Sequence, residues 1–251
     1  KGPRFPEVVR NMADLKRINV PDVADALHYV PAAIKLVKQD LNGRVPLIGF
    51  AGAPWTIFCY MTEGKGSKTF SVARRSLYAD PAFAQALMDR ITDTTIAYLK
   101  LQVQAGADMI QVFDSWAGVL DAHSYRTFAI PCLKRICEAI TEVPVTIFAK
   151  DAWFATADIA ALNCATVGLD WAQDPQWARN TVGPDRTLQG NLDPCVLYAD
   201  AATIRRETAR MLDAFGPQRH IANLGHGVYP DTPVDGVRRF IDTANAHNHR
   251  T

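Results

Sequence analysis

Six short apolar segments, separated by longer amphipathic stretches, constrain the fold of this chain more than any other feature of its sequence. They are Val45–Ala51, Asp108–Phe113, Val143–Ala149, Thr166–Leu169, Thr187–Gly190 and His220–Leu224. Each is apolar over most of its length, as expected for the strands of a parallel sheet that is covered on both faces or closed around a core. The alternation of such strands with helices predicts an α/β fold.

Helix signals occupy the stretches between these segments. Asp80 followed by Pro81 is typical of an N-cap and a first helical residue, and it opens a predicted helix that runs to about Ala105. The other predicted helices are Pro21–Leu41, Asp121–Glu142, Ala201–Phe215 and Pro233–Ala246, with shorter ones after the fourth and fifth strands. No linker, internal repeat or low-complexity tract divides the sequence, so residues 1–251 are predicted to form a single domain.

Two arrangements of these units are open. A doubly wound sheet can be complete with six strands, but it usually carries a glycine-rich first turn, and no G-x-G-x-x-G follows any strand here. A (β/α)8 TIM barrel takes about 250 residues, but this chain supplies about six of its eight βα units. We favour the barrel, with residues 1–251 as its C-terminal part. The first two βα units are then expected to be missing, because the leading helix has no strand in front of it.

Charge and residue distribution exclude several classes of protein. The 27 Lys and Arg residues nearly balance 26 Asp and Glu, with no long run of one sign, so no nucleic-acid partner is expected. No apolar stretch reaches the ~18 residues of a membrane-spanning helix, and the chain opens without a signal-peptide core, so no membrane partner is expected. The five cysteines lack C-x-x-C spacing, which fits a reducing compartment and predicts a cytoplasmic protein.

Polar side chains follow the strands at the end where barrel enzymes place their active sites. Three of them are candidate site residues: Tyr60, Ser115 and His226. Ser115 lacks a G-x-S-x-G elbow, so we interpret it as a hydroxyl donor to a substrate and not as a nucleophile. His226 lies between two glycines, where the backbone can take unusual conformations and a ligand can approach closely, and its imidazole can donate to a carboxylate. Caps, turns and core packing are the structural alternatives for these positions.

Two further features are weaker candidates. The segment Glu63-Gly64-Lys65-Gly66-Ser67-Lys68 lacks the spacing of a phosphate loop, so it is either a positively charged lid or a plain exposed loop. Cys195 and His226 follow the last two strands, but a catalytic zinc needs a third ligand, and neither H-x-C nor H-E-x-x-H is present. No metal site is predicted.

Five motifs at the strand ends together resemble the uroporphyrinogen decarboxylase family. They are Phe50-Ala51-Gly52-Ala53-Pro54-Trp55-Thr56, Ile147-Phe148-Ala149-Lys150-Asp151, Val167-Gly168-Leu169-Asp170-Trp171, Leu188-Gln189-Gly190-Asn191-Leu192-Asp193-Pro194 and Asn223-Leu224-Gly225-His226-Gly227-Val228-Tyr229-Pro230. The resemblance implies a (β/α)8 barrel, usually a homodimer, that removes the carboxyl groups of the four acetate side chains of uroporphyrinogen. The product is coproporphyrinogen, an intermediate of haem biosynthesis, and the family uses no metal or organic cofactor.

The resemblance also implies roles for individual residues. Tyr60, Ser115 and His226 match the family's substrate-contacting tyrosine, hydroxyl residue and histidine, and Phe113 would form part of the cavity wall. Tyr60 would help to orient the family's pyrrole-facing aspartate, and His226 would hydrogen-bond a substrate carboxylate. The family's glycine-rich loop matches Gly64–Lys68, which favours the lid.

The sequence also departs from the family. It contains neither the arginine-rich R-Q-A-G-R segment nor the pyrrole-binding aspartate, so no catalytic residue is assigned. Residues 1–251 alone are expected to be inactive and poorly folded, because an open arc of strands exposes barrel core. Two alternatives stay open: a zinc-dependent corrinoid or thiol methyltransferase of the same superfamily, and a non-catalytic paralogue that binds a tetrapyrrole. The methyltransferase would need a thiolate cluster, and the joint presence of Tyr60, Ser115 and His226 disfavours the paralogue.

Overall fold

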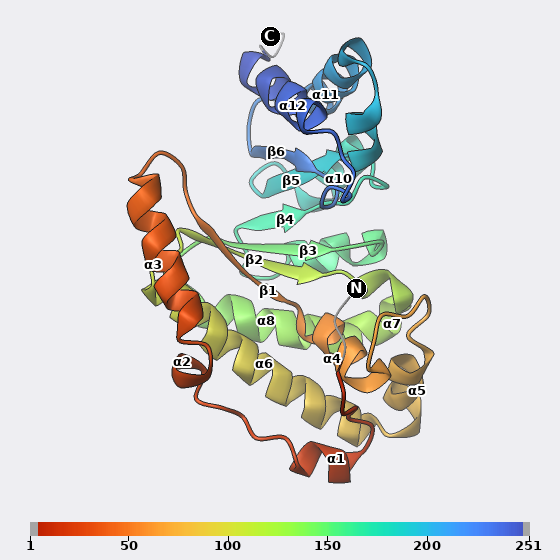
Figure 1. Ribbon diagram of the computed structural model, residues 1–251. Helices are drawn as coiled ribbons and strands as arrows, with labels where there is room; N and C mark the ends of the chain where they lie inside the picture. The colour runs from red at the N-terminus through yellow and green to blue at the C-terminus, as the bar shows by residue number, and fades with distance from the viewer. Residues whose placement is uncertain (1–4, 248–251) are drawn as a thin grey trace. The chain divides into compact units, whose positions relative to one another are not determined.

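The computed structural model describes residues 5–247, and its contacts divide the chain into two compact units, Lys1–Cys164 and Ala165–Thr251. In each unit, parallel strands alternate with helices, which confirms the α/β prediction (Figure 1). Within residues 5–247 each unit holds three strands, in chain order, as expected for six of the eight βα units of a barrel. The single domain stays a prediction.

The sheet of the first unit consists of β1 (Ile48–Gly52), β2 (Met109–Asp114) and β3 (Val145–Ala149). Gly52 pairs with Phe113, and Asp114 pairs with Ala149, so the carboxyl ends of the three strands lie side by side. Figure 1 shows the long helix α6 (Pro81–Gln104) along one face of these strands. The Gln102 side chain fixes α6 to β1, because it accepts from the Phe50 N–H and donates to the Phe50 carbonyl, both at 2.9 Å.

The other helices of the first unit are α1 (Met12–Lys16), α2 (Val23–Ala26), α3 (Tyr29–Leu41), α4 (Pro54–Glu63), α5 (Ser71–Ala79), η1 (Ala117–Val119), α7 (Ala122–Ser124), the π-helix η2 (Tyr125–Ala129), α8 (Ile130–Ala139), η3 (Trp153–Ala155) and α9 (Thr156–Ala160). Several of these helices contact α6, and α4 also contacts β2.

Helix starts were predicted better than helix continuity. Helix α6 begins at Pro81 as predicted, and the Asp80 carboxylate caps it by accepting from the Phe83 N–H at 3.0 Å. The predicted helix Pro21–Leu41 is wrong as a single element, because the backbone leaves helical geometry at Leu27 and separates α2 from α3.

The predicted helix Asp121–Glu142 is likewise interrupted. Asp121 caps its start, but the segment divides into α7, η2 and α8, with the π-helical turn ahead of Pro131. Proline has no N–H to donate, so the regular hydrogen-bond ladder is broken there.

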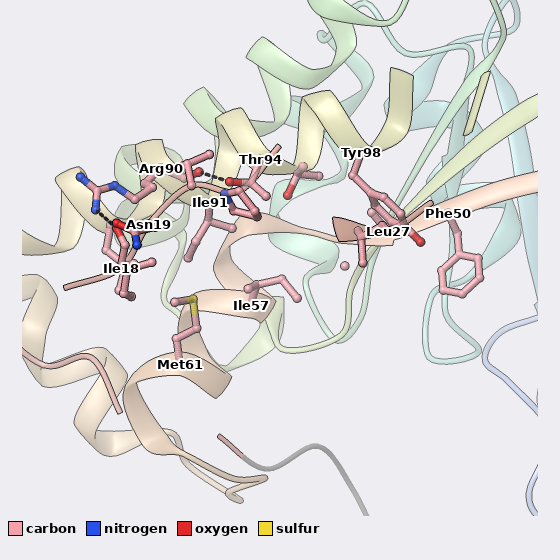
Figure 2. A pocket seen from close by; sticks show the side chains of 16 residues that line it. Ile18, Asn19, Leu27, Phe50, Ile57, Met61, Arg90, Ile91, Thr94 and Tyr98 are labelled. Atoms are coloured by element: carbon pink, nitrogen blue, oxygen red, sulfur yellow. Dashed lines mark hydrogen bonds between the residues drawn. The ribbon is translucent and has the colours of Figure 1, made fainter. Parts of the chain in front are cut away.

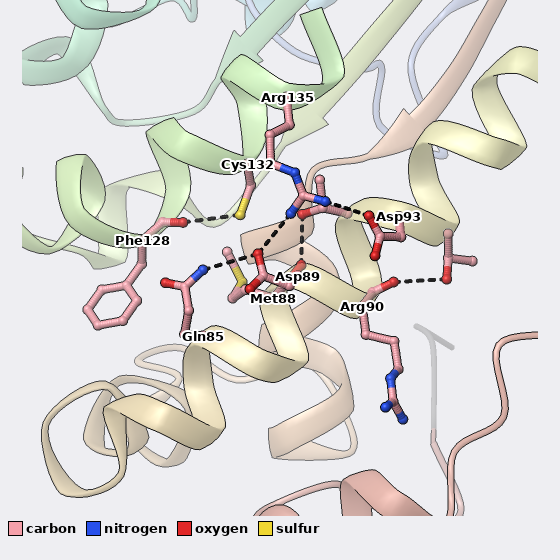
Figure 3. A network of polar contacts seen from close by, with 10 residues as sticks. Gln85, Met88, Asp89, Arg90, Asp93, Phe128, Cys132 and Arg135 are labelled. Carbon is pink, nitrogen blue, oxygen red and sulfur yellow. Dashed lines mark hydrogen bonds and ion pairs between the residues drawn. The ribbon is translucent and has the colours of Figure 1, made fainter. Parts of the chain in front are cut away.

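A polar network fastens α8 to α6 (Figure 3). The Arg135 guanidinium reaches across from α8, donating to Asp89 at 2.8 Å and to Asp93 one turn further along α6. Gln85 donates to the same Asp89 carboxylate at 3.2 Å. The ionic side chains are roughly 40% or more exposed to solvent, so salt screens their attraction.

Replacing Arg135 with alanine is expected to lower the free energy of unfolding by about 1 kcal/mol, since one guanidinium serves two carboxylates. The loss should shrink in 1 M NaCl, as denaturant titration would measure. The control is Lys134→Ala on the same helix, whose ammonium lies 3.8 Å from Glu138. Equal losses in the two variants would contradict a specific role for Arg135.

The second unit holds β4 (Thr166–Gly168), β5 (Thr187–Leu192) and β6 (His220–Leu224), with Leu192 paired to Leu224 at the carboxyl ends. Helix α11 (Ala201–Phe215) packs on β5 and against α12 (Val234–Ala246), as Figure 1 shows. The remaining helices are α10 (Pro175–Val182) and η4 (Pro194–Tyr198). The His220 ring stacks on Phe215 with centroids 4.0 Å apart, which ties β6 to the end of α11.

Candidate functional site

The carboxyl end of β2 brings three of the four predicted site residues together. Phe113 lies within an aromatic row that crosses the sheet, with its ring centroid 6.0 Å from both Phe50 on β1 and Phe148 on β3. Successive strand residues point to opposite faces, so Asp114 turns away from this row and Ser115 follows on from the strand end. Phe113 and Ser115 are both half-buried. The row presents a broad apolar wall at this end of the sheet.

Tyr60 reaches the same place from α4. Its ring meets Trp116 edge-on at 6.3 Å and Phe70 at 6.0 Å, and Trp116 packs on Phe70 at 4.6 Å. Tyr60 and Ser115 are therefore linked through Trp116, which directly follows Ser115 in the chain. The indole N–H of Trp116 is buried and makes no hydrogen bond to any of residues 5–247.

A buried carboxyl group lies directly behind these residues. Asp114 is fully enclosed and accepts hydrogen bonds from the Thr56 hydroxyl at 2.7 Å and the Tyr125 hydroxyl at 2.9 Å. Burial raises the pKa of Asp114 to about 6, although both hydroxyl donors act in the opposite direction. The charge of Asp114 in turn helps burial to raise the pKa of Tyr125 and of the Cys59 thiol.

Asp114 and Thr56 are not among the residues predicted from sequence. Only their positions in the sequence could have indicated them. Asp114 directly precedes Ser115 at the end of an apolar strand, and Thr56 lies one helical turn before Tyr60. A carboxylate at a strand end is most simply interpreted as solvent-exposed, and only packing of α4 and η2 against it shows that it is buried.

His226, the fourth predicted residue, belongs to the second unit. It is exposed in the loop after β6, and its ring meets Trp171 edge-on at 6.2 Å. The proposed reason for its flanking glycines needs correction, since neither Gly225 nor Gly227 has a positive φ. A Cβ on Gly225 would lie 2.2 Å from the Trp171 backbone nitrogen, so glycine is needed for close packing of two backbone segments. The placement of His226 near the other three residues stays a prediction.

The loop Gly64–Lys68 follows α4 directly. Gly64 ends the helix with a φ of 85°, a left-handed conformation that favours glycine. Lys65 and Lys68 are exposed, and the Ser67 hydroxyl accepts from the Phe70 N–H at 3.1 Å. The two positive charges are therefore exposed to solvent in the loop that follows the helix of Tyr60, and the lid stays a prediction.

Four of the cysteines within residues 5–247 are buried free thiols, namely Cys59, Cys132, Cys137 and Cys164, and Cys195 at the start of η4 is an exposed one. Within those residues, no three His, Cys, Asp or Glu side chains gather as metal ligands would. No helix in that part of the chain is long and apolar enough to cross a bilayer.

A cavity of about 400 Å³ lies beside β1, between α6 and the segment before α2 (Figure 2). Its lining is mostly apolar, with Ile57 and Met61 of α4 facing Ile91 of α6. The one guanidinium in the lining, that of Arg90, donates to the carbonyls of Leu15 and Ile18 at 2.7 and 2.9 Å. Phe50 of the aromatic row also lines this cavity, whereas Tyr60, Phe113 and Ser115 do not.

Sequence comparisons give one consistent family. A family model described as "Uroporphyrinogen decarboxylase (URO-D)" matches residues 1–247. A protein named uroporphyrinogen decarboxylase from Flavobacterium johnsoniae is 44% identical over 247 residues, which cover 98% of this chain and 72% of that protein. Proteins of the same name from Salinibacter ruber and Homo sapiens are each 46% identical, over 99% of this chain and 71% and 70% of their own lengths.

Comparison of structures supports the fold. A methyltransferase from Methanosarcina mazei matches with a TM-score of 0.81 at 18% identity, over 98% of this chain and 71% of its own. A B12-independent methionine synthase from a Shewanella species matches with a TM-score of 0.63 at 13% identity, over 86% of this chain and 64% of its own. At these identities the likeness concerns the chain path and not the chemistry.

Proposed function

The chain belongs to the uroporphyrinogen decarboxylase family, and from this premise we propose that it converts uroporphyrinogen III to coproporphyrinogen III by removing four acetate carboxyl groups. The observation that carries the proposal is the family match over residues 1–247, a span that includes Tyr60, Phe113, Ser115 and His226. The enzyme is then a carboxy-lyase of porphyrin biosynthesis.

The proposed reaction needs shielding and charge placement more than a reactive side chain. Protonation of the pyrrole carbon that bears an acetate makes a ring cation. The bond to the carboxylate then breaks, its electron pair returns to the ring, and CO2 leaves. A second proton then adds to the side-chain carbon that carried the carboxylate, and the first proton leaves the ring carbon, so that the pyrrole is restored with a methyl group and one net proton is taken up. An enzyme accelerates this sequence by holding the macrocycle away from water and placing charge against the developing cation.

Four residues of this chain are proposed to hold the substrate. The aromatic row around Phe113 offers an apolar wall to the macrocycle, and Ser115 and Tyr60 offer hydroxyl groups at its edge. His226 is proposed to donate a hydrogen bond to a substrate carboxylate. Asp114 does not fit the family's pyrrole-facing aspartate, because both of its oxygens are enclosed and accept from Thr56 and Tyr125.

We also propose a cytoplasmic homodimer that works without a metal or organic cofactor. This part of the proposal is supported by family membership, since the family resemblance implies each of these properties. We do not propose methyltransferase activity. The methyltransferase and the methionine synthase are only 18% and 13% identical to this chain, so they share its fold alone. Measurement of the mass of the purified protein by light scattering would test the dimer.

We expect the natural full-length protein to release CO2 from uroporphyrinogen III and to produce coproporphyrinogen III. Residues 1–251 expressed alone are expected to release none, because carboxylate-binding arginines and the pyrrole-facing aspartate are absent from this sequence. The measurement is oxidation of the products followed by chromatography with fluorescence detection, under anaerobic conditions. No turnover by the full-length protein would overturn the proposed function. Turnover by residues 1–251 alone would show instead that the reaction does not need the absent arginines and aspartate.

A further inference from the structure

We propose that Asp114 is a positioning residue of this site: through Thr56 it fixes the backbone of Trp116, and thereby places Ser115 and Tyr60 for contact with the substrate. The inference rests on the proposed function, because it takes Ser115 and Tyr60 as substrate contacts. Nothing in the family resemblance assigns a role to Asp114 or Thr56.

The first step is the direction of the Thr56 hydroxyl. A hydroxyl has one proton to donate, and the Thr56 hydroxyl donates it to Asp114 Oδ1 at 2.7 Å. The lone pairs of Thr56 Oγ1 are then left to accept, and the backbone N–H of Trp116 donates to this oxygen at 3.3 Å. The carboxylate therefore sets which way the hydroxyl points, and the hydroxyl holds the Trp116 amide.

The second step is that neighbouring residues of α4 hold both polar groups of the Trp116 backbone. The Trp55 indole Nε1–H donates to the Trp116 carbonyl at 3.0 Å, while Thr56 accepts from its N–H. Ser115 lies between Asp114 and Trp116, so its position is fixed on both sides. Tyr60 is on the same helix, four residues after Thr56, and packs against the Trp116 ring.

The third step is that Asp114 itself is anchored from separate elements. Tyr125 of η2 donates to its second carboxylate oxygen at 2.9 Å, and the Lys150 N–H after β3 donates to its backbone carbonyl at 3.0 Å. A fully buried carboxyl group with a raised pKa costs stability when it is ionised. An apolar side chain of similar size would fill the same space without this cost in stability. The buried carboxyl group is therefore better explained by a role in positioning than by packing alone.

The test removes the Thr56 hydroxyl and leaves the volume of the side chain nearly unchanged. In the natural full-length protein, Thr56→Val is expected to lower kcat/KM by roughly 10- to 100-fold, mainly through kcat, because misplaced groups lose reactive geometry. Thr56→Ser keeps the hydroxyl and is expected to restore kcat/KM to within about threefold of the wild type.

Thr62→Val is the matched control. Thr62 is on the same helix and is also buried, but its hydroxyl donates to the Phe58 carbonyl at 2.8 Å within α4 and not to the strand end. We expect kcat/KM of this variant to stay within about threefold of the wild type, since an intrahelical hydroxyl bond does not hold the site. Losses as large in Thr62→Val as in Thr56→Val, or no loss in Thr56→Val, would overturn the proposal.

A second measurement does not depend on turnover. Amide hydrogen exchange of Trp116, followed by NMR, is expected to be slow in the wild type and in Thr56→Ser, and at least tenfold faster in Thr56→Val. Fast exchange in the wild type would overturn the inference even if Thr56→Val failed to fold. An active wild type whose Thr56 variants show no effect rejects the positioning role and leaves the proposed function intact. An inactive wild type rejects the function instead.

Discussion

Replacing Gly225 with alanine should destabilise the second unit by about 3 kcal/mol, because the added methyl group has no space. Its Cβ would lie 2.2 Å from the Trp171 nitrogen, 2.8 Å from the Trp171 Cα and 2.9 Å from the Asp170 carbonyl carbon. These are all backbone atoms, so a side-chain rotation cannot relieve the overlap. Separating the two segments would also strain the hydrogen bond from the Gly225 N–H to the Leu192 carbonyl, now 2.7 Å.

Gly227→Ala is the matched control for this prediction. Gly227 lies on the other side of His226, its φ is not positive, and an added Cβ would meet nothing within 4 Å. We expect a change of no more than about 0.5 kcal/mol there. Denaturant unfolding and amide exchange of the β5 and β6 residues would measure both variants. Equal behaviour of the two glycine variants would contradict the close packing of residues 225 and 171.

The pH dependence of stability should reveal Asp114. Its folded pKa of about 6 exceeds its ordinary value of 3.8, so the folded protein binds this proton more tightly than the unfolded chain does. The resulting stabilisation is complete below about pH 4 and is lost as the pH rises towards 6. Relative to Asp114→Asn, which does not titrate, the wild type should therefore lose about 3 kcal/mol across that window. The other titratable groups near the carboxyl are Tyr125, Cys59 and Cys132, and burial raises all of their pKa values, so they stay neutral there.

Asp121 supplies a control of opposite sign. Hydrogen bonds, first from the Ser124 hydroxyl and then from the Ser124 N–H, lower the pKa of Asp121 to about 2. Its stabilisation is present above about pH 4 and is lost as the pH falls towards 2. Relative to Asp121→Asn, the wild type should lose stability on acidification, and by less than at Asp114 because Asp121 is exposed. Unfolding titrations between pH 2 and 7 would measure both pairs, and parallel curves for the wild type and Asp114→Asn would contradict the buried carboxyl.

The strands were predictable because their flanks carry clear polar and turn signals. Strand β6 has the predicted bounds, His220–Leu224, and the other strands differ by a few residues at their ends. Helix α4, by contrast, was not predicted. Six of its ten residues are buried, so its sequence shows apolar residues on nearly every side and no period of 3.6. Its remaining signals are Pro54 at the start and Gly64 after the end.

Residue type and position in the sequence indicated Tyr60 and Ser115, and the family resemblance indicated Phe113. The structure places all three side chains near the carboxyl end of β2, and their contact with a substrate stays a prediction. Asp114 and Thr56 act through contacts between segments 58 residues apart, and periodicity in one sequence does not reveal such pairings. The reason for Gly225 was missed on the same ground, since it depends on a neighbouring backbone segment and not on its own conformation.

The uneven exposure of the thiols makes Cys195 a natural attachment point for a probe. Four of the five cysteines are buried, so a maleimide dye or spin label should react with the folded protein at one position in the second unit. No cysteine needs to be removed for this. A second label introduced on the exposed surface of the first unit would then allow the distance between the units, and any change in it when a tetrapyrrole binds, to be measured in solution.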